Sequence, residues 1–386
     1  MDKKQKRGKR LSCKYIFVIL LFGMLLLGAL GQIVVKTSNL EGENIQKDCP
    51  EMTLADILNG NWQALFEEYF AEQIKIREYL IPVRNQIMYQ LFSTSPNKNI
   101  VIGKNGNLYE EEYICYELQI YPAMTSAEVE NLVYKLKLLK NLLEQKNKSL
   151  FIYITPSKAR VYAEDIPEIY KMISPDVKEE STYSLFIDDL EESGIAYYDS
   201  TLDVIELKKN VAYDVFPKTG THWSKVTQAV SAKRLGEELE KQLHIDLPQI
   251  TIDFTVSEEP LHPDADLYKL LNLIEESGET YYAPIINIED EQKEIYTLLA
   301  RGGSFMGESI YSTLILNNYF EKSYYMENTF AISSEGIFNF NSYEELDLKA
   351  ILEESDIVLL EVNEEAINRM SFGFVDYLLE NNILDY

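Results

Sequence analysis

Cysteine and histidine are scarce in this chain, with three residues of each among 386. So few cysteines exclude the disulfide framework that stabilises many small secreted domains. So few histidines leave little material for a metal centre built on imidazole ligands. The sequence also lacks a Gly-x-Gly-x-x-Gly run and a phosphate-binding loop, so it gives no support for nucleotide chemistry. We therefore expect neither a metal nor a cofactor.

Positive charge is the second shortage. The chain has 36 basic and 63 acidic residues, for a net charge of −27. Seven of the bases precede residue 15, beside the single acid Asp2, so the rest of the chain is more acidic still. Such a surface repels nucleic acid and anionic lipid headgroups, which argues against nucleic acid as a partner. Two interpretations stay open: a neutral or weakly charged partner, and a surface that is acidic only for solubility.

The amino terminus combines a basic tail, residues 1–14, with a nearly continuous apolar run from Tyr15 to Val35. About 20 apolar residues are enough to cross a bilayer, and a basic cluster ahead of them stays in the cytoplasm. We expect a single-pass membrane anchor at residues 15–35, a polar spacer at 36–51 and an extracytoplasmic remainder. A cleaved signal peptide is the alternative, because Ala29-Leu30-Gly31 offers small residues at the positions that a signal peptidase reads.

Residues 52–96 predict a helical segment that leads into the main domain. Trp62, Leu65, Phe66 and Tyr69 recur at the spacing of one helix face. Pro82 should break or restart the helix, because proline lacks the backbone N–H that a helix interior uses.

Residues 97–386 alternate between strand and helix patterns. Short apolar runs predict strands at residues 100–102, 150–154, 195–198, 296–300 and 357–361. Capping residues Thr125 and Ser224 open amphipathic helices between them, and a further helix near 182–192 ends at Gly194. This alternation predicts an α/β fold in which a parallel sheet lies between helices on both faces, as three layers.

One candidate for chemistry follows the predicted strand at 296–300. Ser304 comes directly after Gly302 and Gly303, at the strand end where active residues of parallel sheets gather. The glycines let the backbone turn sharply and bring amide N–H groups near the serine, as a nucleophile with an oxyanion hole requires. A plain glycine turn with a capping serine is the other interpretation.

The second candidate is His222, at the mouth of the helix that Ser224 caps. It is the best candidate for a histidine base, because His244 and His262 lie in polar, loop-like surroundings. A purely structural histidine is the alternative. Trp223 beside it would pack in the core or form a platform on which a sugar stacks.

Five segments resemble, in the same order, those of the alginate O-acetyltransferase group of the SGNH hydrolase superfamily. The resemblance begins near residue 55 with a helical opening and runs to the end of the chain. The four later segments are Ile102–Tyr109, which is similar to "GKDGWLF", Ile154–Ala159, similar to "P-S-K", Thr221–Trp223, similar to "D-x-H-W", and Gly303–Phe305, similar to "G-D-S-F".

This resemblance implies an SGNH hydrolase-like fold in which Ser304 is the nucleophile that takes an acyl group and His222 is its general base. It implies an O-acetyltransferase that acetylates hydroxyls of a cell-surface or secreted polysaccharide. By analogy the acetyl group would come from a multi-pass membrane acyltransferase. The alternatives are a carbohydrate acetylesterase and an inactive polysaccharide-binding or assembly subunit.

Two positions depart from the pattern of the family. Gly220 stands in place of the aspartate two residues before the histidine, and Gly303 in place of the aspartate before the serine. Without the first aspartate, the histidine lacks the group that fixes its tautomer and supports its charge. We expect a substitute carboxylate, first of all Glu361, because the strand at 357–361 ends in that acid. The further candidates are Glu364, Asp199 and Asp214.

Overall fold

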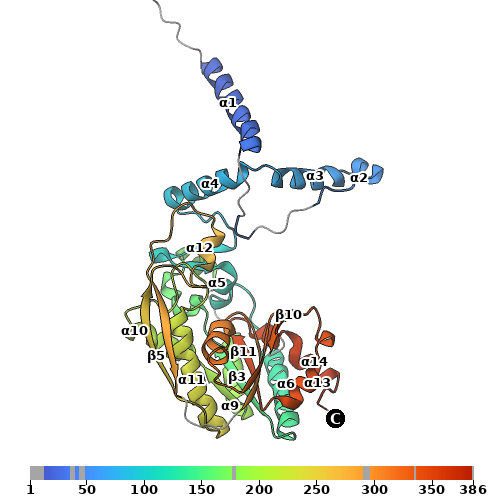
Figure 1. Ribbon diagram of the computed structural model, residues 1–386, viewed down its shortest axis with the longest axis vertical. Coiled ribbons are helices and arrows are strands. Elements are labelled where there is room, and N and C mark those ends of the chain that lie inside the picture. Colours follow the sequence, from blue (N-terminus) through green and yellow to red (C-terminus); the bar gives the residue numbers. More distant parts are fainter. Residues whose placement is uncertain are drawn as a thin grey trace, which may run out of the picture. The chain divides into compact units, whose positions relative to one another are not determined.

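Figure 1 shows the computed structural model of the chain, which describes residues 13–34, 40–42, 48–175, 180–289, 296–333 and 336–384. The chain divides into two compact units. The first consists of residues Met1–Pro96 and Lys269–Glu276, and the second of Asn97–Tyr268 and Ser277–Tyr386. The basic tail at residues 1–14 falls almost entirely outside the described residues.

The first unit is helical over its described amino-terminal part, with helices α1 (Cys13–Val34), α2 (Leu54–Asn59), α3 (Asn61–Glu72) and α4 (Arg77–Phe92). The predicted interruption at Pro82 is wrong, because α4 continues through it. Pro82 lies early in the helix, where it costs one backbone hydrogen bond. No helix within the described ranges combines the length and the apolar character that crossing a membrane requires.

The second unit is built on a seven-stranded sheet in the order β10-β9-β8-β7-β11-β3-β4. Its strands are β3 (Ser149–Thr155), β4 (Ala196–Asp199), β7 (Thr297–Gly302), β8 (Lys322–Glu327), β9 (Phe330–Ser333), β10 (Gly336–Asn339) and β11 (Ile357–Asn363). The predicted strands at 150–154, 195–198, 296–300 and 357–361 are confirmed as β3, β4, β7 and β11. All four are parallel to their neighbours in the sheet, and β8 is parallel to β7.

The sequence predicts a parallel sheet, but the observed sheet is mixed. Strands β9 and β10 extend it in antiparallel order beyond β8. The tight connection from β8 to β9 uses Asn328 with a φ of 44°, a conformation that asparagine tolerates better than most residues. The expectation of a parallel sheet therefore holds for five of the seven strands.

Helices cover both faces of this sheet, which confirms the three layers (Figure 1). One face carries α6 (Ser126–Glu144), α9 (Thr182–Ser193), α13 (Leu348–Glu354) and α14 (Phe374–Glu380), and the other carries α11 (Lys225–Leu243) and the π-helix η3 (Gly307–Ile315). Side chains of β3 alternate between the two cores, with Phe151 and Tyr153 on one face and Ile152 and Ile154 on the other. This is the alternation that a strand buried on both faces requires.

The second unit also contains two small antiparallel sheets. Strand β1 (Ile100–Ile102) pairs with β2 (Leu108–Glu110), and β5 (Ile250–Ser257) pairs with β6 (Tyr281–Ile288). The β5–β6 pair was not predicted, and the connection between its strands carries the short helix α12 (Asp266–Leu270). The remaining elements are η1 (Lys104–Gly106), α5 (Glu111–Glu117), α7 (Lys158–Val161), η2 (Ala163–Asp165), α8 (Glu168–Ile173), α10 (Thr201–Asn210), η4 (Tyr343–Glu345) and η5 (Ile367–Gly373).

Candidate active site

Ser304 lies in the tight turn between β7 and η3, at the carboxyl end of a central strand. Backbone hydrogen bonds from Met306 N–H to the Gly303 carbonyl and from Gly307 N–H to the Ser304 carbonyl close this turn. Phe305 is almost fully buried and anchors it, whereas Ser304 is exposed. The hydroxyl is thereby held at the surface on a rigid support, as a nucleophile requires.

His222 is positioned beside Ser304 by the start of α11. The Ser224 side chain caps this helix by accepting a hydrogen bond from Thr227 N–H. His222 Nε2 lies 2.8 Å from Ser304 Oγ, although 82 residues separate the two in the chain. This distance lies inside the range that we expect of a base and its nucleophile. The Phe305 ring packs against the imidazole, with 4.9 Å between centroids.

Asp266, at the start of α12, occupies the other side of the imidazole. Its Oδ2 lies 2.5 Å from His222 Nδ1. Its Oδ1 accepts hydrogen bonds from the backbone N–H groups of Thr221, at 2.8 Å, and Leu267, at 2.6 Å. A carboxylate with this set of donors is held in one orientation. Asp266, His222 and Ser304 therefore form a continuous hydrogen-bonded chain of the kind that activates a serine.

Two hydrogen bonds between Thr219 and the segment around Asp266 hold this carboxylate in place. Tyr268 N–H donates to the Thr219 carbonyl at 2.9 Å, and the Thr219 hydroxyl donates to the Asp264 carbonyl at 2.9 Å. The same segment explains Gly220. A Cβ on Gly220 would lie 2.6 Å from the Asp264 carbonyl oxygen and 3.2 Å from Asp266 Oδ1. Residues 264–266 thus fill the space into which a side chain at position 220 would extend.

The charges around His222 favour its protonated form. Burial alone would lower its pKa, but the hydrogen bond and charge of Asp266, with the charges of Glu110 and Glu327, raise the pKa above the usual value. An imidazolium that forms during a reaction would be stabilised in the same way.

Glu361 does not orient His222, so this expectation is corrected. Its Oε2 accepts a hydrogen bond from Gly303 N–H at 2.8 Å, and its Oε1 accepts one from the Thr155 hydroxyl at 2.6 Å. Both ring nitrogens of His222 are already engaged by Asp266 and Ser304. Burial raises the pKa of Glu361 to about 7, although the two hydrogen bonds act against this shift. Glu361 therefore stabilises the turn that carries Ser304, through its hydrogen bond with Gly303 N–H.

The three further candidates for the orienting carboxylate also lie elsewhere. Glu364 accepts a hydrogen bond from Ser157 N–H, and Asp199 accepts one from the Tyr183 hydroxyl. Asp214 contributes its charge to the surroundings of Lys158, and Asp266 is the carboxylate at His222 Nδ1. Asp266 was missed because it belongs to the unpredicted β5–β6 connection. The alternation of Ile250, Ile252, Phe254 and Val256 was the available signal for that strand pair.

The predicted oxyanion and substrate residues have different surroundings from those expected. The Gly303 N–H is used by Glu361, and a Cβ on Gly302 would lie 2.5 Å from Glu361 Oε2. Gly302 therefore allows the close approach of Glu361 to the turn, whereas Gly303 takes part through its backbone N–H, since a Cβ there would lie at an ordinary 3.8 Å from Glu361 Oε2. Trp223 is fully buried and packs against Phe305 and Tyr153, so it is a core residue and not a sugar platform.

A cavity of about 160 Å³ opens beside Ser304 and is bounded by the turn, the end of β11 and η5. Asn363, two residues after Glu361 on the same face of β11, lines it. The Asn363 side chain is 6% exposed, and its Nδ2 has no hydrogen-bond partner. A buried amide left unpaired beside an exposed hydroxyl is a donor available to a ligand. Asn363 was not among the site residues predicted from the sequence.

Lys158 stabilises the segment that precedes His222. Its side chain is 2% exposed, and its Nζ donates hydrogen bonds to the carbonyl oxygens of Pro217, Lys218 and Gly220, at 2.6, 3.0 and 2.9 Å. Ser157 caps the short helix α7 that carries the lysine, by accepting a hydrogen bond from Arg160 N–H. The segment Ile154–Ala159, which resembles a segment of the family, thus helps to position His222, because Lys158 binds the backbone that precedes the histidine.

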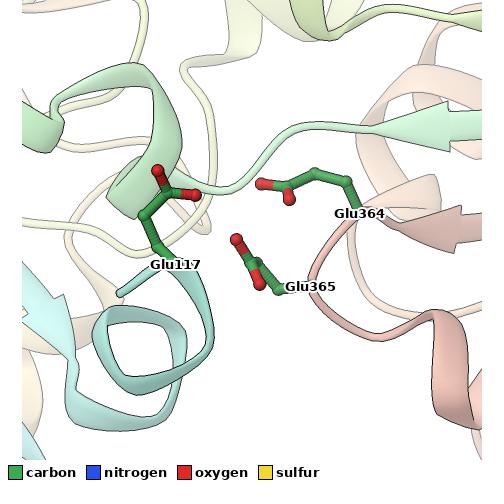
Figure 2. A group of neighbouring side chains, drawn as sticks. All are labelled: Glu117, Glu364 and Glu365. Atoms are coloured by element: carbon green, nitrogen blue, oxygen red, sulfur yellow. The ribbon is translucent and has the colours of Figure 1, made fainter. Parts of the chain in front are cut away.

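A group of three carboxylates lies apart from this site (Figure 2). Glu117 at the end of α5 faces Glu364 and Glu365, which follow β11. Their oxygen atoms are close enough to hold a metal ion. However, Arg160 pairs with all three, at 3.0 Å to Glu117, 2.9 Å to Glu364 and 3.4 Å to Glu365. The guanidinium already supplies positive charge at this place, which fits a structural ion-pair network.

Comparison with known proteins places these residues in a family. Residues 100–309, more than half of the chain, match the family model described as "SGNH hydrolase-like domain, acetyltransferase AlgX". The "Probable alginate O-acetylase AlgJ" of Pseudomonas aeruginosa is 28% identical over 252 residues, which are 65% of this chain and 59% of that protein. The chain thus spans about three fifths of the length of this curated relative.

Two solved structures are also similar. The O-acetyltransferase domain of Pseudomonas putida AlgJ aligns with a TM-score of 0.45 and 16% identity, over 74% of this chain and 99% of that one. Pseudomonas aeruginosa AlgX aligns with a TM-score of 0.45 and 16% identity, over 72% of this chain and 67% of that one. On the match of the family model, the chain belongs to the AlgX family of SGNH hydrolase-like acetyltransferase domains.

Proposed function

We propose that this protein is an O-acetyltransferase that acetylates hydroxyl groups of a polysaccharide through an acetyl-Ser304 intermediate. The observation that carries the proposal is the chain of hydrogen bonds from Asp266 through His222 to the exposed Ser304 hydroxyl. Membership of the acetyltransferase family supports it.

In the first half-reaction, Ser304 Oγ attacks the carbonyl carbon of the acetyl donor while His222 Nε2 takes the hydroxyl proton. The bond between the acetyl group and the donor then breaks, and His222 gives the proton to the departing oxygen. In the second half-reaction a sugar hydroxyl attacks acetyl-Ser304, His222 takes its proton, and Ser304 Oγ leaves and recovers that proton. Asp266 keeps Nδ1 protonated and supports the positive charge in both steps.

Asn363 is our candidate for stabilising the tetrahedral intermediates. Asn363 lines the cavity beside Ser304 and its Nδ2 has no hydrogen-bond partner, so this amide is a candidate donor to the oxygen on which negative charge develops. The Ser304 backbone N–H is the second candidate donor. Gly303 N–H is excluded as long as Glu361 holds it.

A carbohydrate acetylesterase remains the second candidate, because the same residues would serve and Ser304 is open to water. The two differ only in the acceptor, so hydrolysis of an acetyl ester should be followed with and without added oligosaccharide. A transferase forms acetylated sugar at the expense of free acetate, whereas an esterase releases acetate at the same rate in both cases. The inactive-subunit alternative rested on Gly220, and Asp266 now supplies the missing carboxylate. Absence of both products in wild type would restore that alternative.

We further propose that residues 15–35 anchor the protein in the membrane and that the remainder works outside the cytoplasm. The support is the apolar run at residues 15–35, which follows a segment with seven basic residues. By family analogy, a multi-pass membrane acyltransferase would deliver the acetyl group. Protease added to intact wall-stripped cells should digest the domain that carries Ser304. Full protection of that domain would contradict this placement.

A further inference from the structure

Helix α4 presents apolar side chains to the outside and polar ones to the protein. Leu80, Val83, Ile87 and Leu91 are all exposed, and their spacing of three and four residues places them on one face of the helix. We call this face the α4 stripe. An amphipathic helix of a globular domain turns such a face toward the core. The described part of the chain leaves the α4 stripe uncovered, so something else must cover it.

The opposite face of α4 is occupied by protein. The buried Asn85 side chain donates a hydrogen bond to the Leu271 carbonyl oxygen at 2.8 Å. The buried Gln86 side chain accepts two hydrogen bonds, from Ile274 N–H at 2.9 Å and Glu275 N–H at 3.1 Å. All these residues belong to the first compact unit. The α4 stripe therefore cannot turn inward without leaving these buried polar groups unpaired.

The start of α4 lies against the end of α1 (Figure 1). Ile76, the residue just before α4, packs on Gly31, since a Cβ on this glycine would lie 3.0 Å from Ile76 Cδ1. Earlier in α1, residues 15–22 are consecutive exposed apolar side chains, so they occupy every face of that helix. A helix that is apolar all round requires apolar surroundings. Because the two helices touch, the surroundings of α1 extend to the start of α4.

Helix α3 adds an aromatic row to the same unit. Trp62, Phe66 and Phe70 follow one another at intervals of four residues, and their rings stack with 4.8 and 6.1 Å between centroids. Phe70 is exposed and Trp62 is partly exposed. Tryptophan is enriched where the hydrocarbon of a bilayer meets the headgroups, because its ring is amphipathic. The row is thus typical of a segment at a membrane interface.

From these contacts we infer that α4 lies along the outer surface of the membrane, with the α4 stripe at the boundary between lipid headgroups and acyl chains. This inference rests on the proposed membrane anchor and adds a second lipid contact. Helices of this kind bury their apolar face by about 5–10 Å. The contact is apolar and not electrostatic, because a chain with a net charge of −27 is repelled by anionic headgroups.

This placement has a consequence for the acyl transfer. The second unit, which carries Ser304, begins at Asn97, and only residues 93–96 separate it from the end of α4. A connection of this length extends by no more than about 18 Å. A helix fixed on the bilayer would therefore keep the start of the second unit close to the membrane surface, where a membrane acyltransferase would deliver the acetyl group.

Tryptophan fluorescence can locate the α4 stripe, because the chain has two tryptophans and Trp223 is fully buried. In full-length protein, Trp62→Phe removes the other tryptophan and Ile87→Trp places a reporter in the stripe. The protein is reconstituted into vesicles of phosphatidylcholine that is brominated near the start of its acyl chains. Bromine quenches an indole that it contacts. We expect Ile87→Trp to lose most of its added emission, relative to vesicles without bromine.

Two controls define the contact. Leu202→Trp in the same background should keep its emission, because Leu202 is exposed on α10 of the second unit. Addition of phosphatidylglycerol to the vesicles should leave the quenching of Ile87→Trp unchanged, because the contact is apolar. Equal quenching of Leu202→Trp and Ile87→Trp would show unspecific contact with lipid and overturn the inference.

Extraction with alkaline carbonate tests the anchor separately, so the two failures can be distinguished. If the protein resists extraction, but acrylamide in the water quenches Ile87→Trp and brominated lipid does not, the inference is overturned and the anchor stands. If carbonate removes the protein, but brominated lipid quenches Ile87→Trp beforehand, the anchor fails and the lipid contact of α4 stands. If neither quencher reaches Ile87→Trp, a protein surface such as a second copy covers the stripe, and the inference is wrong.

Discussion

The Asp266 carboxylate accepts a hydrogen bond from His222 Nδ1 across 44 residues of sequence, at 2.5 Å. Its position depends on Gly220, since a side chain there would collide with the Asp264 carbonyl. Asp266 can thus approach His222 only because position 220 has no side chain. The loss of one aspartate from the sequence pattern is offset by another from a different loop.

Replacing Asp266 with asparagine should lower the rate of acyl transfer by about two to four orders of magnitude. The amide cannot accept the Nδ1–H in the same way and cannot support an imidazolium. Steady-state kinetics with an acetyl ester would measure this. Glu361→Gln is the comparison, because its carboxylate supports the turn and does not touch the imidazole, so its loss should be much smaller. The reverse order of the two effects would return the orienting role to Glu361.

The pH profile should show an acidic limb that lies above the usual range of histidine. His222 must be neutral to accept the serine proton, and its pKa is raised, so the rate should increase as pH rises through a value above about 6.5. Asp266→Asn should move this limb to lower pH, because the negative charge of Asp266, which helps to raise the pKa of His222, is lost.

Glu361 also titrates near 7 and could produce the same limb. Glu361→Gln decides between the two groups. A limb that stays in place in this variant belongs to His222. A limb that disappears would show that Glu361 controls the rate.

Alanine at position 220 should lower both stability and activity. Its Cβ would lie 2.6 Å from a backbone oxygen, so residues 264–266 would have to move. We expect a loss of about 1–3 kcal/mol in the free energy of unfolding and a slower reaction as Asp266 shifts. Gly303→Ala is the matched control for stability, because its nearest neighbour would lie at an ordinary 3.5 Å. Equal stability of Gly220→Ala and wild type would refute the packing argument.

Removal of the Asn363 amide should lower kcat by about 10²–10³-fold if its Nδ2 binds the oxyanion. Asn363→Asp and Asn363→Ala should both show this loss, because neither supplies the donor. Donor KM should change little, since the interaction strengthens as charge develops. A loss confined to KM would indicate that Asn363 binds substrate only.

Local patterns were sufficient to predict the sheet strands β3, β7 and β11, because these runs are apolar on both faces. The edge strand β4 was predicted from a short apolar run that follows the helix-ending Gly194. The Ser304–His222 contact was also predicted, from the position of Ser304 after a strand and from the order of the segments that resemble the family. Asp266 could not be predicted, because its approach to His222 depends on how the β5–β6 connection folds back on residues 219–221. Glu361 was misjudged because a strand end fixes the location of a carboxylate but not its hydrogen-bond partner.

The most direct test of the account is to look for the acetyl group on Ser304. Purified protein should be mixed with an acetyl ester donor, quenched rapidly and analysed by mass spectrometry of the intact chain and its peptides. The account predicts a gain of one acetyl group on Ser304, its loss on addition of oligosaccharide, and none in Ser304→Ala. Transfer that proceeds in Ser304→Ala, or an acetyl group that accumulates on another residue and is passed to the sugar, would contradict it.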